Sequence, residues 1–283
     1  MAAAQSPTLR QKRLGAELRK LRERSGLSST AAAAEIGVPQ ARISMIEGGR
    51  YRVSAERVRA MARVYACDDS ELVEALTGLT GGRSRGWWDE YRELLPAALV
   101  DVAEVEHHAT ALRAAVVVTM PGLVQILDHT RAALAQNVPR LLPHEIEHRA
   151  SFRIKRQAIL HRSPAVPYTA IIHEAALRMG FGGPDVTRTQ LEFLIEAGQM
   201  DNTTILVVPF GLGDYPASGQ PISYVSGPVP QLDTVILDSD HGCTFLDAEA
   251  QVSRYRSILD RMESCALTAR KSRDLIRRIA RDA

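Results

Sequence analysis

Residues 27–50, LSSTAAAAEIGVPQARISMIEGGR, decide the fold of the N-terminal part of this chain. Ser28 is a good N-cap for a short alanine-rich helix, and Gly37 can end that helix because glycine adopts positive φ at little cost. Pro39 suits the first turn of a second helix that runs to about Glu47, where no backbone N–H is needed. Two short helices joined by a tight turn are typical of a helix-turn-helix unit.

Small and apolar residues stand where such a unit needs them. Ala33 is small at the expected contact between the two helices, and Gly37 permits the turn. The inner faces are expected to be buried through Ile36, Val38, Ile43 and Ile46. A helical hairpin in a bundle that binds nothing is the alternative, and the basic charge of the surrounding sequence disfavours it.

The flanking sequence extends this unit to a five-helix domain over residues 9–77. Leu14, Leu18 and Leu21 form one apolar stripe on a basic helix over 9–25. Two further helices are expected at about 54–66 and 69–77. The glycine-rich segment that follows predicts a linker over 78–86.

Composition favours a two-domain protein of the cytoplasm. The chain has 283 residues, 45% of them hydrophobic, and its three scattered cysteines do not suggest a disulfide framework. The start shows no signal peptide, and no apolar run approaches the roughly 20 residues that span a membrane. Residues 1–66 carry 13 Lys and Arg against 5 Asp and Glu, whereas the remainder carries 22 against 28. A basic head on an acidic body favours a polyanionic partner.

Residues 9–77 resemble the DNA-binding head of Xre-type repressors. The residues that carry the resemblance are Leu27-Ser28-Ser29, Ala32-Ala33, Gly37-Val38-Pro39, Ile43-Ser44, Ile46-Glu47 and Gly49-Arg50. Ser29 stands where the family commonly has a glutamine that touches a phosphate, and Pro39 replaces the serine that caps the recognition helix.

This resemblance implies two sets of DNA contacts. The base-reading set on the recognition helix would be Gln40, Ala41, Arg42, Ser44 and Met45. The phosphate-contacting set would be Ser29, Arg50 and Arg52. Gln40 can pair with adenine, and Arg42 with guanine or a phosphate. The alternatives are a solvated Arg42 and a Met45 that covers the edge of the core.

The resemblance also implies an ion pair inside the head, between Arg22 and Glu47. A carboxylate beside two isoleucines is costly to bury alone, and a guanidinium can satisfy both of its oxygens. We therefore expect a direct salt bridge, shielded from water, between the first helix and the recognition helix. An exposed and weak pair is the alternative.

The second region, residues 87–283, predicts an α+β domain with a mostly antiparallel sheet. One or two amphipathic helices are expected over 87–113, then helices at about 123–135, 143–162, 186–198, 248–265 and 269–281. Short β-branched runs predict strands at 168–172, 204–208, 222–225, 234–237 and 243–246.

This region resembles the uncharacterised C-terminal domain of actinobacterial regulators of the WhiJ type. The likeness rests on Gly86-Trp87-Trp88, residues 121–125, Arg153-x-x-Arg156-Gln157-x-x-Leu160, residues 174–177, Gln190-Leu191-x-x-Leu194, Val208-Pro209-Phe210 and residues 272–276. It implies a regulator that works with a small protein encoded nearby, in an antitoxin-like arrangement, or that senses an unknown ligand.

Residue patterns for catalysis, metal or cofactor binding are lacking. His173-Glu174 begins like a zinc-protease helix, but Leu177 stands where the second histidine is required. His144 and His148 could share a metal, yet no third ligand is evident, and a solvated helix is preferred. The pair Trp87-Trp88 is expected to pack at the domain junction and not to stack on bases. The sequence therefore predicts no enzyme, no metal and no cofactor.

Taken together, these features predict a homodimeric transcriptional regulator that binds double-stranded DNA at a near-palindromic operator. The C-terminal domain would dimerise and bind a partner protein or a ligand. An antitoxin-like repressor that mainly restrains a small partner protein is the first alternative. An enzyme domain tethered to a DNA-binding head is the second.

Overall fold

The protein is described from a computed structural model that covers residues 7–80, 86–212, 215–239 and 241–283. The chain divides into two compact units. The first comprises the residues up to Gly86 together with Pro228–Leu232, and the second comprises Trp87–Gly227 and Asp233–Ala283. Each unit has a hydrophobic core of its own. Part of the predicted linker, residues 81–85, lies outside the described residues.

The first unit is the all-α head that the sequence predicts. Its helices are α1 (Leu9–Arg24), α2 (Ser29–Ile36), α3 (Gln40–Glu47), α4 (Ala55–Val64) and α5 (Ser70–Gly78). Thr8, Ser28, Ser54 and Asp69 each accept a backbone N–H in the first turn of α1, α2, α4 and α5. Pro39 precedes α3 as its N-cap and supplies no such bond.

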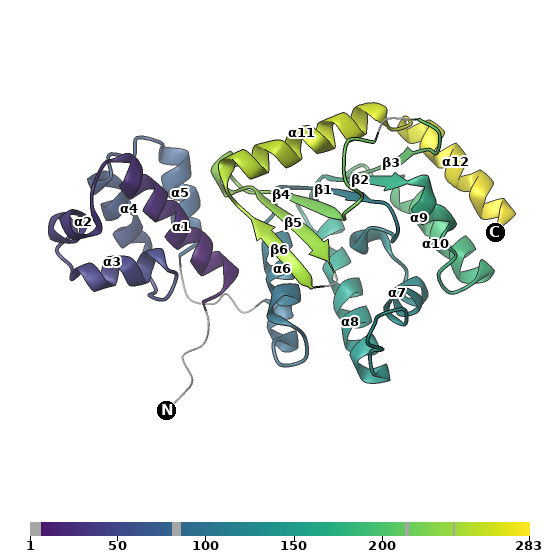
Figure 1. Cartoon of the computed structure of the whole chain (residues 1–283), viewed down its shortest axis with the longest axis horizontal. Helices are drawn as coiled ribbons and strands as arrows, with labels where there is room; N and C mark the ends of the chain where they lie inside the picture. The colour runs from purple at the N-terminus through teal and green to yellow at the C-terminus, as the bar shows by residue number, and fades with distance from the viewer. Residues whose placement is uncertain (1–6, 81–85, 213–214, 240) are drawn as a thin grey trace. The chain divides into compact units, whose positions relative to one another are not determined.

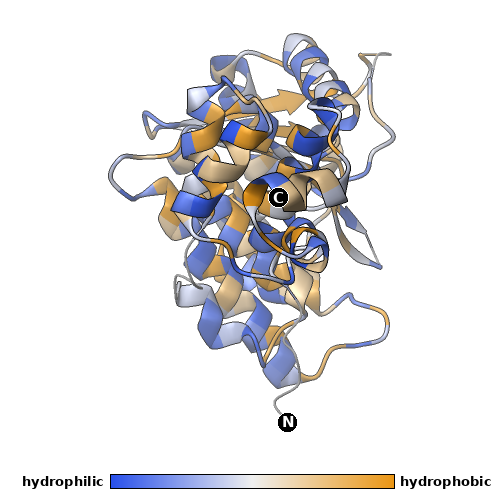
Figure 2. Cartoon of the chain, turned by 90° about the vertical axis from the view of Figure 1, so that its left-hand side faces the viewer, coloured by the Kyte–Doolittle hydropathy of each residue, from blue (hydrophilic) through white to orange (hydrophobic). Residues whose placement is uncertain are grey.

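The core of the head forms where the helices turn their apolar stripes inward. Leu14, Leu18 and Leu21 of α1 are buried, as are Ile43 of α3 and Met61 of α4. In Figure 2 hydrophobic and hydrophilic residues alternate along the helical ribbons, as expected for helices with one face buried.

The second unit is an α+β domain around a mixed, mostly antiparallel sheet. Its helices are α6 (Ala97–His107), α7 (Leu127–Leu134), α8 (Pro143–Arg156), α9 (Glu174–Arg178), α10 (Pro184–Ala197), α11 (Glu249–Cys265) and α12 (Ala269–Asp282). Its strands are β1 (Ala111–Val116), β2 (Tyr168–His173), β3 (Thr203–Val208), β4 (Ile222–Ser226), β5 (Thr234–Ser239) and β6 (Gly242–Leu246). The described strands follow the order β3-β2-β1-β4-β5-β6. The neighbours β1–β2 and β2–β3 run parallel, and the other three pairs are antiparallel.

Strand β1 corrects the prediction of helix over 87–113. The segment begins with a short 3-10 helix, Trp87–Tyr91, and α6, but Ala111–Val116 is a strand between β2 and β4. Its sequence, ALRAAV, is rich in alanine and has little intrinsic preference for a strand. Pairing on both sides therefore decides its conformation, and no local signal predicts it.

Helices cover both faces of the sheet (Figure 1). Ala115, Ile171 and Val235 pack on one face against Leu259 of α11. The alternate residues of the same strands face a larger cluster that includes residues of α9, α10 and α12. The alternation follows from the two-residue period of a strand, which turns neighbouring side chains to opposite faces.

Edge strand β3 is protected by the segment that begins α12. The N–H of Val207 donates to the Ser272 hydroxyl at 2.9 Å, and the N–H of Leu267 donates to the Val207 carbonyl at 2.8 Å. These bonds satisfy backbone groups that an open edge would leave free for another chain.

The tryptophan pair packs inside the second unit. Trp88 is 1% exposed and belongs to a small cluster with Tyr91, Phe152 and the partly buried Trp87. It is therefore a core residue of this domain.

None of the described helices combines the length and apolar character that crossing a bilayer requires.

Candidate nucleic-acid interface

Helices α2 and α3 of the head form a two-helix unit with a tight turn. Gly37 ends α2 in the left-handed conformation, with φ of 73°, which a side chain would disfavour. Ala33 is 4% exposed, and Ile43 and Ile46 of α3 are also buried. The inner side of α3 is therefore held against the head core.

The outer side of α3 is open. Gln40, Ala41, Ser44 and Met45 are exposed, and Arg42 is half-buried. Met45 keeps 38% of its surface exposed, so it lies on the solvent side and is not enclosed by the core. These residues include each position of the predicted base-reading set.

The Gln40 amide joins the two helices. Its Nε2 donates to Ser29 Oγ of α2 and to Ser44 Oγ of α3, each at 3.1 Å. The resemblance to Xre-type heads implies that Gln40 contacts a base and Ser29 a phosphate. The structure places the two side chains in contact.

Arg42 is held by Tyr51, a residue that sequence reasoning missed. Arg42 Nη1 donates to the Tyr51 hydroxyl at 3.0 Å, and its guanidinium carbon lies 4.5 Å from the centre of the Tyr51 ring. This arrangement combines a hydrogen bond with a cation–π contact. The only sequence signal was an aromatic residue next to Arg50, which does not reveal a partner nine positions away.

Arg50 and Arg52 follow α3 as exposed cations. Neither side chain has a hydrogen bond or ion pair with another described residue. Helix α1 lies close to this segment at Gly49. A Cβ added at Gly49 would lie only 2.8 Å from the backbone nitrogen of Lys12, so a larger residue there would collide with α1. The backbone of Lys12, an exposed residue of α1, therefore lies close to the segment that carries the two predicted cations.

The predicted Arg22–Glu47 salt bridge is present. Arg22 Nε donates to Glu47 Oε1 at 2.6 Å and Arg22 Nη2 to Oε2 at 3.0 Å. Both side chains are only 9% exposed. The hydrogen bond to Glu47 is the main reason that the pKa of Arg22 is raised. Arg22 Nη1 also donates to the Leu27 carbonyl at 2.8 Å, so the guanidinium joins α1, the turn before α2 and the end of α3.

Gly15 sets how closely α1 approaches α3, a second feature that the sequence did not reveal. A Cβ at Gly15 would lie 2.4 Å from the Glu47 carbonyl oxygen and 2.5 Å from that of Ile46. Both neighbours are backbone atoms, which cannot turn aside as a flexible side chain can. Only glycine therefore permits this helix spacing.

The comparisons with known proteins agree with this geometry. Residues 13–76 match a helix-turn-helix domain, which is the class of the head. Residues 99–278, more than half of the chain, match the domain of unknown function DUF5753, and the chain belongs to this family. No curated protein and no solved structure matches the chain.

Proposed function

We propose that this protein is a sequence-specific DNA-binding transcriptional regulator with an Xre-type head. The observation that carries the proposal is the asymmetry of α3, whose inner side is locked by Ile43, Ile46 and the Glu47 salt bridge while its outer side is open and polar. A helix of this kind can lie in the major groove without unfolding the head.

The proposed contacts follow from the chemistry of the exposed groups. Gln40 can present its amide oxygen and nitrogen to adenine after releasing the two serines. Arg42 can reach guanine or a phosphate, at the expense of its contact with Tyr51. Arg50, Arg52 and Ser29 would bind phosphates and set the register of the head on the duplex.

The test begins with selection of the preferred site from randomised duplexes, followed by binding titrations over a range of salt concentrations. Arg50→Ala and Arg52→Ala should weaken binding about equally on selected and random DNA, and each should reduce the salt slope by about one. Gln40→Ala should instead cost about 1–3 kcal/mol of discrimination at one base pair. Arg63→Ala, an exposed arginine on α4, is the control for charge alone. A change of base preference with an unchanged salt slope in Arg50→Ala would contradict the phosphate assignment.

We further propose that the protein acts as a cytoplasmic homodimer without enzymatic activity. One recognition helix contacts too few base pairs for specificity in a genome, so two heads on half-sites about one helical turn apart, or a multiple of it, are expected. The DUF5753 domain would supply dimerisation and bind a partner protein or a small effector, as the resemblance to regulators of the WhiJ type implies. Residues 80–283 expressed alone should then be dimeric by light scattering at micromolar concentration, and a monomer would count against this part of the proposal.

A further inference from the structure

The second unit contains a hollow of about 310 Å³ beside the N-terminal half of α11. Its apolar lining comes from Ile222 at the start of β4, Leu246 at the end of β6 and Ile258 of α11, with Pro216 and Ala217 on the preceding loop. A volume of this size lies at the lower end of the range for small-molecule sites. It can hold a compact apolar group such as one aromatic ring.

Polar side chains converge on the same hollow without partners of their own. Gln220 comes from the loop before β4, and Gln251, Arg254 and Tyr255 come from α11. Within the described ranges, none of these four side chains forms a hydrogen bond, ion pair or ring contact. Gln251 and Arg254 are exposed and can turn to a ligand without breaking a contact within the described chain. An apolar lining with a few polar groups beside it is typical of small-molecule sites.

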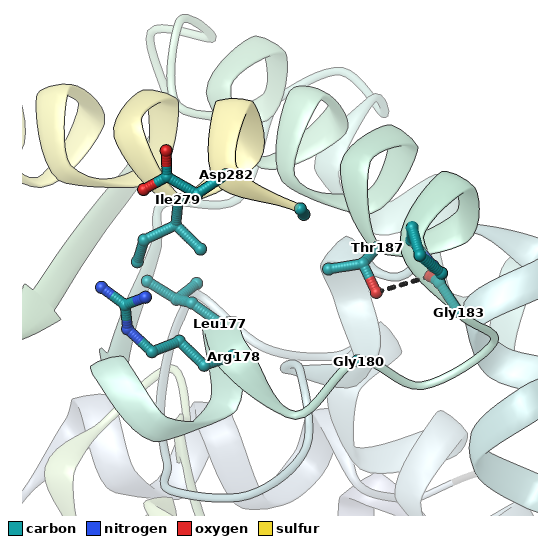
Figure 3. Close-up of a pocket in the computed structure, with 9 residues that line it drawn as sticks. Leu177, Arg178, Gly180, Gly183, Thr187, Ile279 and Asp282 are labelled. Carbon is teal, nitrogen blue, oxygen red and sulfur yellow. Dashed lines mark hydrogen bonds between the residues drawn. The ribbon is translucent and has the colours of Figure 1, made fainter.

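Another hollow of comparable size, about 260 Å³, differs in this respect. Figure 3 shows it between the end of α12 and the loop before α10. Its Arg178 is bound to Glu174 at 2.7 Å, and its Thr187 hydroxyl donates to the Gly183 carbonyl at 2.8 Å. Asp282 adds a negative charge, so this lining favours neither sign of ligand charge. The lining of the hollow beside α11 therefore favours one sign of ligand charge more clearly than this second lining does.

We propose that the hollow beside α11 binds a small organic acid, with its apolar body against Ile222, Leu246 and Ile258 and its carboxylate on Arg254. Among the described residues of the lining, Arg254 alone has a side chain that is charged at neutral pH. A guanidinium matches a carboxylate with two parallel hydrogen bonds, and a neutral amide cannot offer the same pair of acceptors. Gln220 and Gln251 can bind a second polar group of the ligand. The inference names the class of effector in the proposed function and rests on that part of it.

The test uses the full-length protein and ¹⁹F NMR titrations with two probes of the same shape. The probes are 4-(trifluoromethyl)benzoate and its neutral analogue 4-(trifluoromethyl)benzamide. The benzoate should bind saturably and more tightly than the benzamide. Arg254→Gln should weaken benzoate binding about tenfold, the scale of one charge-assisted pair, and change benzamide binding little. Gln251→Glu places a negative charge at the same site and should also weaken only the benzoate.

Arg270→Gln is the matched control, because Arg270 is an exposed arginine on α12 outside the hollow. It should leave both titrations unchanged. The proposal is overturned if the benzoate does not saturate by about 20 mM, if the benzamide binds equally well, or if Arg270→Gln weakens the benzoate as much as Arg254→Gln does. DNA affinity of Arg254→Gln without a probe should equal that of the wild type. Failure of DNA binding in the wild type would instead count against the function of the head alone.

Discussion

The Arg22–Glu47 salt bridge makes the sharpest test of how the recognition helix is held. Arg22→Ala removes two hydrogen bonds to Glu47 and one to the Leu27 carbonyl. Because both side chains of the pair are only 9% exposed, Glu47 would remain as a largely buried charge without its partner. Breaking a buried pair in this way costs about 3–5 kcal/mol, and we expect the lower end because Glu47 can gain some water after the change.

Hydrogen exchange of backbone amides in the full-length protein can measure this loss of stability separately in the helices of the head and in the second unit. A loss of about 3 kcal/mol should lower the protection of amides in α1 and α3 by a factor on the order of 100, with little change in the second unit. The double variant Arg22→Met with Glu47→Leu replaces the whole pair by apolar groups and should stay within about 1 kcal/mol of the wild type.

Arg19→Ala is the control on the same helix. Arg19 pairs with Glu23 at 2.7 Å, but the side chains are 62% and 51% exposed, so protection should change little. The reasoning is refuted if Arg22→Ala exchanges like the wild type. It is also refuted if the double variant is as unstable as the single one, because the loss would then come from packing and not from an unpaired charge.

Two further changes have definite expected outcomes. Gly15→Ala should destabilise the head by about 1–3 kcal/mol, because the added Cβ would collide with two carbonyl oxygens. The better helix propensity of alanine does not offset this collision. Gly78→Ala is the control, because the space around Gly78 is open, and it should not destabilise the head. Thermal unfolding by circular dichroism compares the two, and equal effects would contradict the role of the close approach. His129 of α7 is 3% exposed, and burial, with a smaller effect of Arg153, lowers its pKa to about 4. Below about pH 6.5 the His129 side chain is protonated in the unfolded chain but stays neutral in the folded chain until the pH nears 4. The free energy of unfolding of the second unit should therefore fall by up to about 3 kcal/mol as the pH falls from 6.5 to 4. Denaturant unfolding followed by tryptophan fluorescence measures the free energy of unfolding at each pH. This free energy should depend less on pH in His129→Leu than in the wild type, whereas His144→Leu should behave like the wild type. The same pH dependence in His129→Leu and the wild type would contradict the role given to His129.

The sequence by itself determined the head and the position of its outward-facing residues. Caps, glycines and apolar spacing act within one or two helical turns, so they predict helix ends to within one or two residues, as at Ser28 and Gly37. The same periodicity predicts which side of α3 is buried through Ile43 and Ile46, and therefore which side is open. The strands β2 to β6 were also predictable, because their β-branched runs are bounded by turn residues.

Only the tertiary structure decided the features that depend on partners far away in the chain. Strand β1 has a sequence without strand preference and is extended because β2 and β4 pair with it on either side. The contact of Arg42 with Tyr51 and the close approach at Gly15 depend on how separate segments meet. Gln220, Ile222, Leu246 and Arg254 surround one hollow although the loop, strands and helix that carry them are separated in sequence. A local pattern reports the free energy of a few neighbouring residues, whereas these arrangements are set by the packing of whole elements.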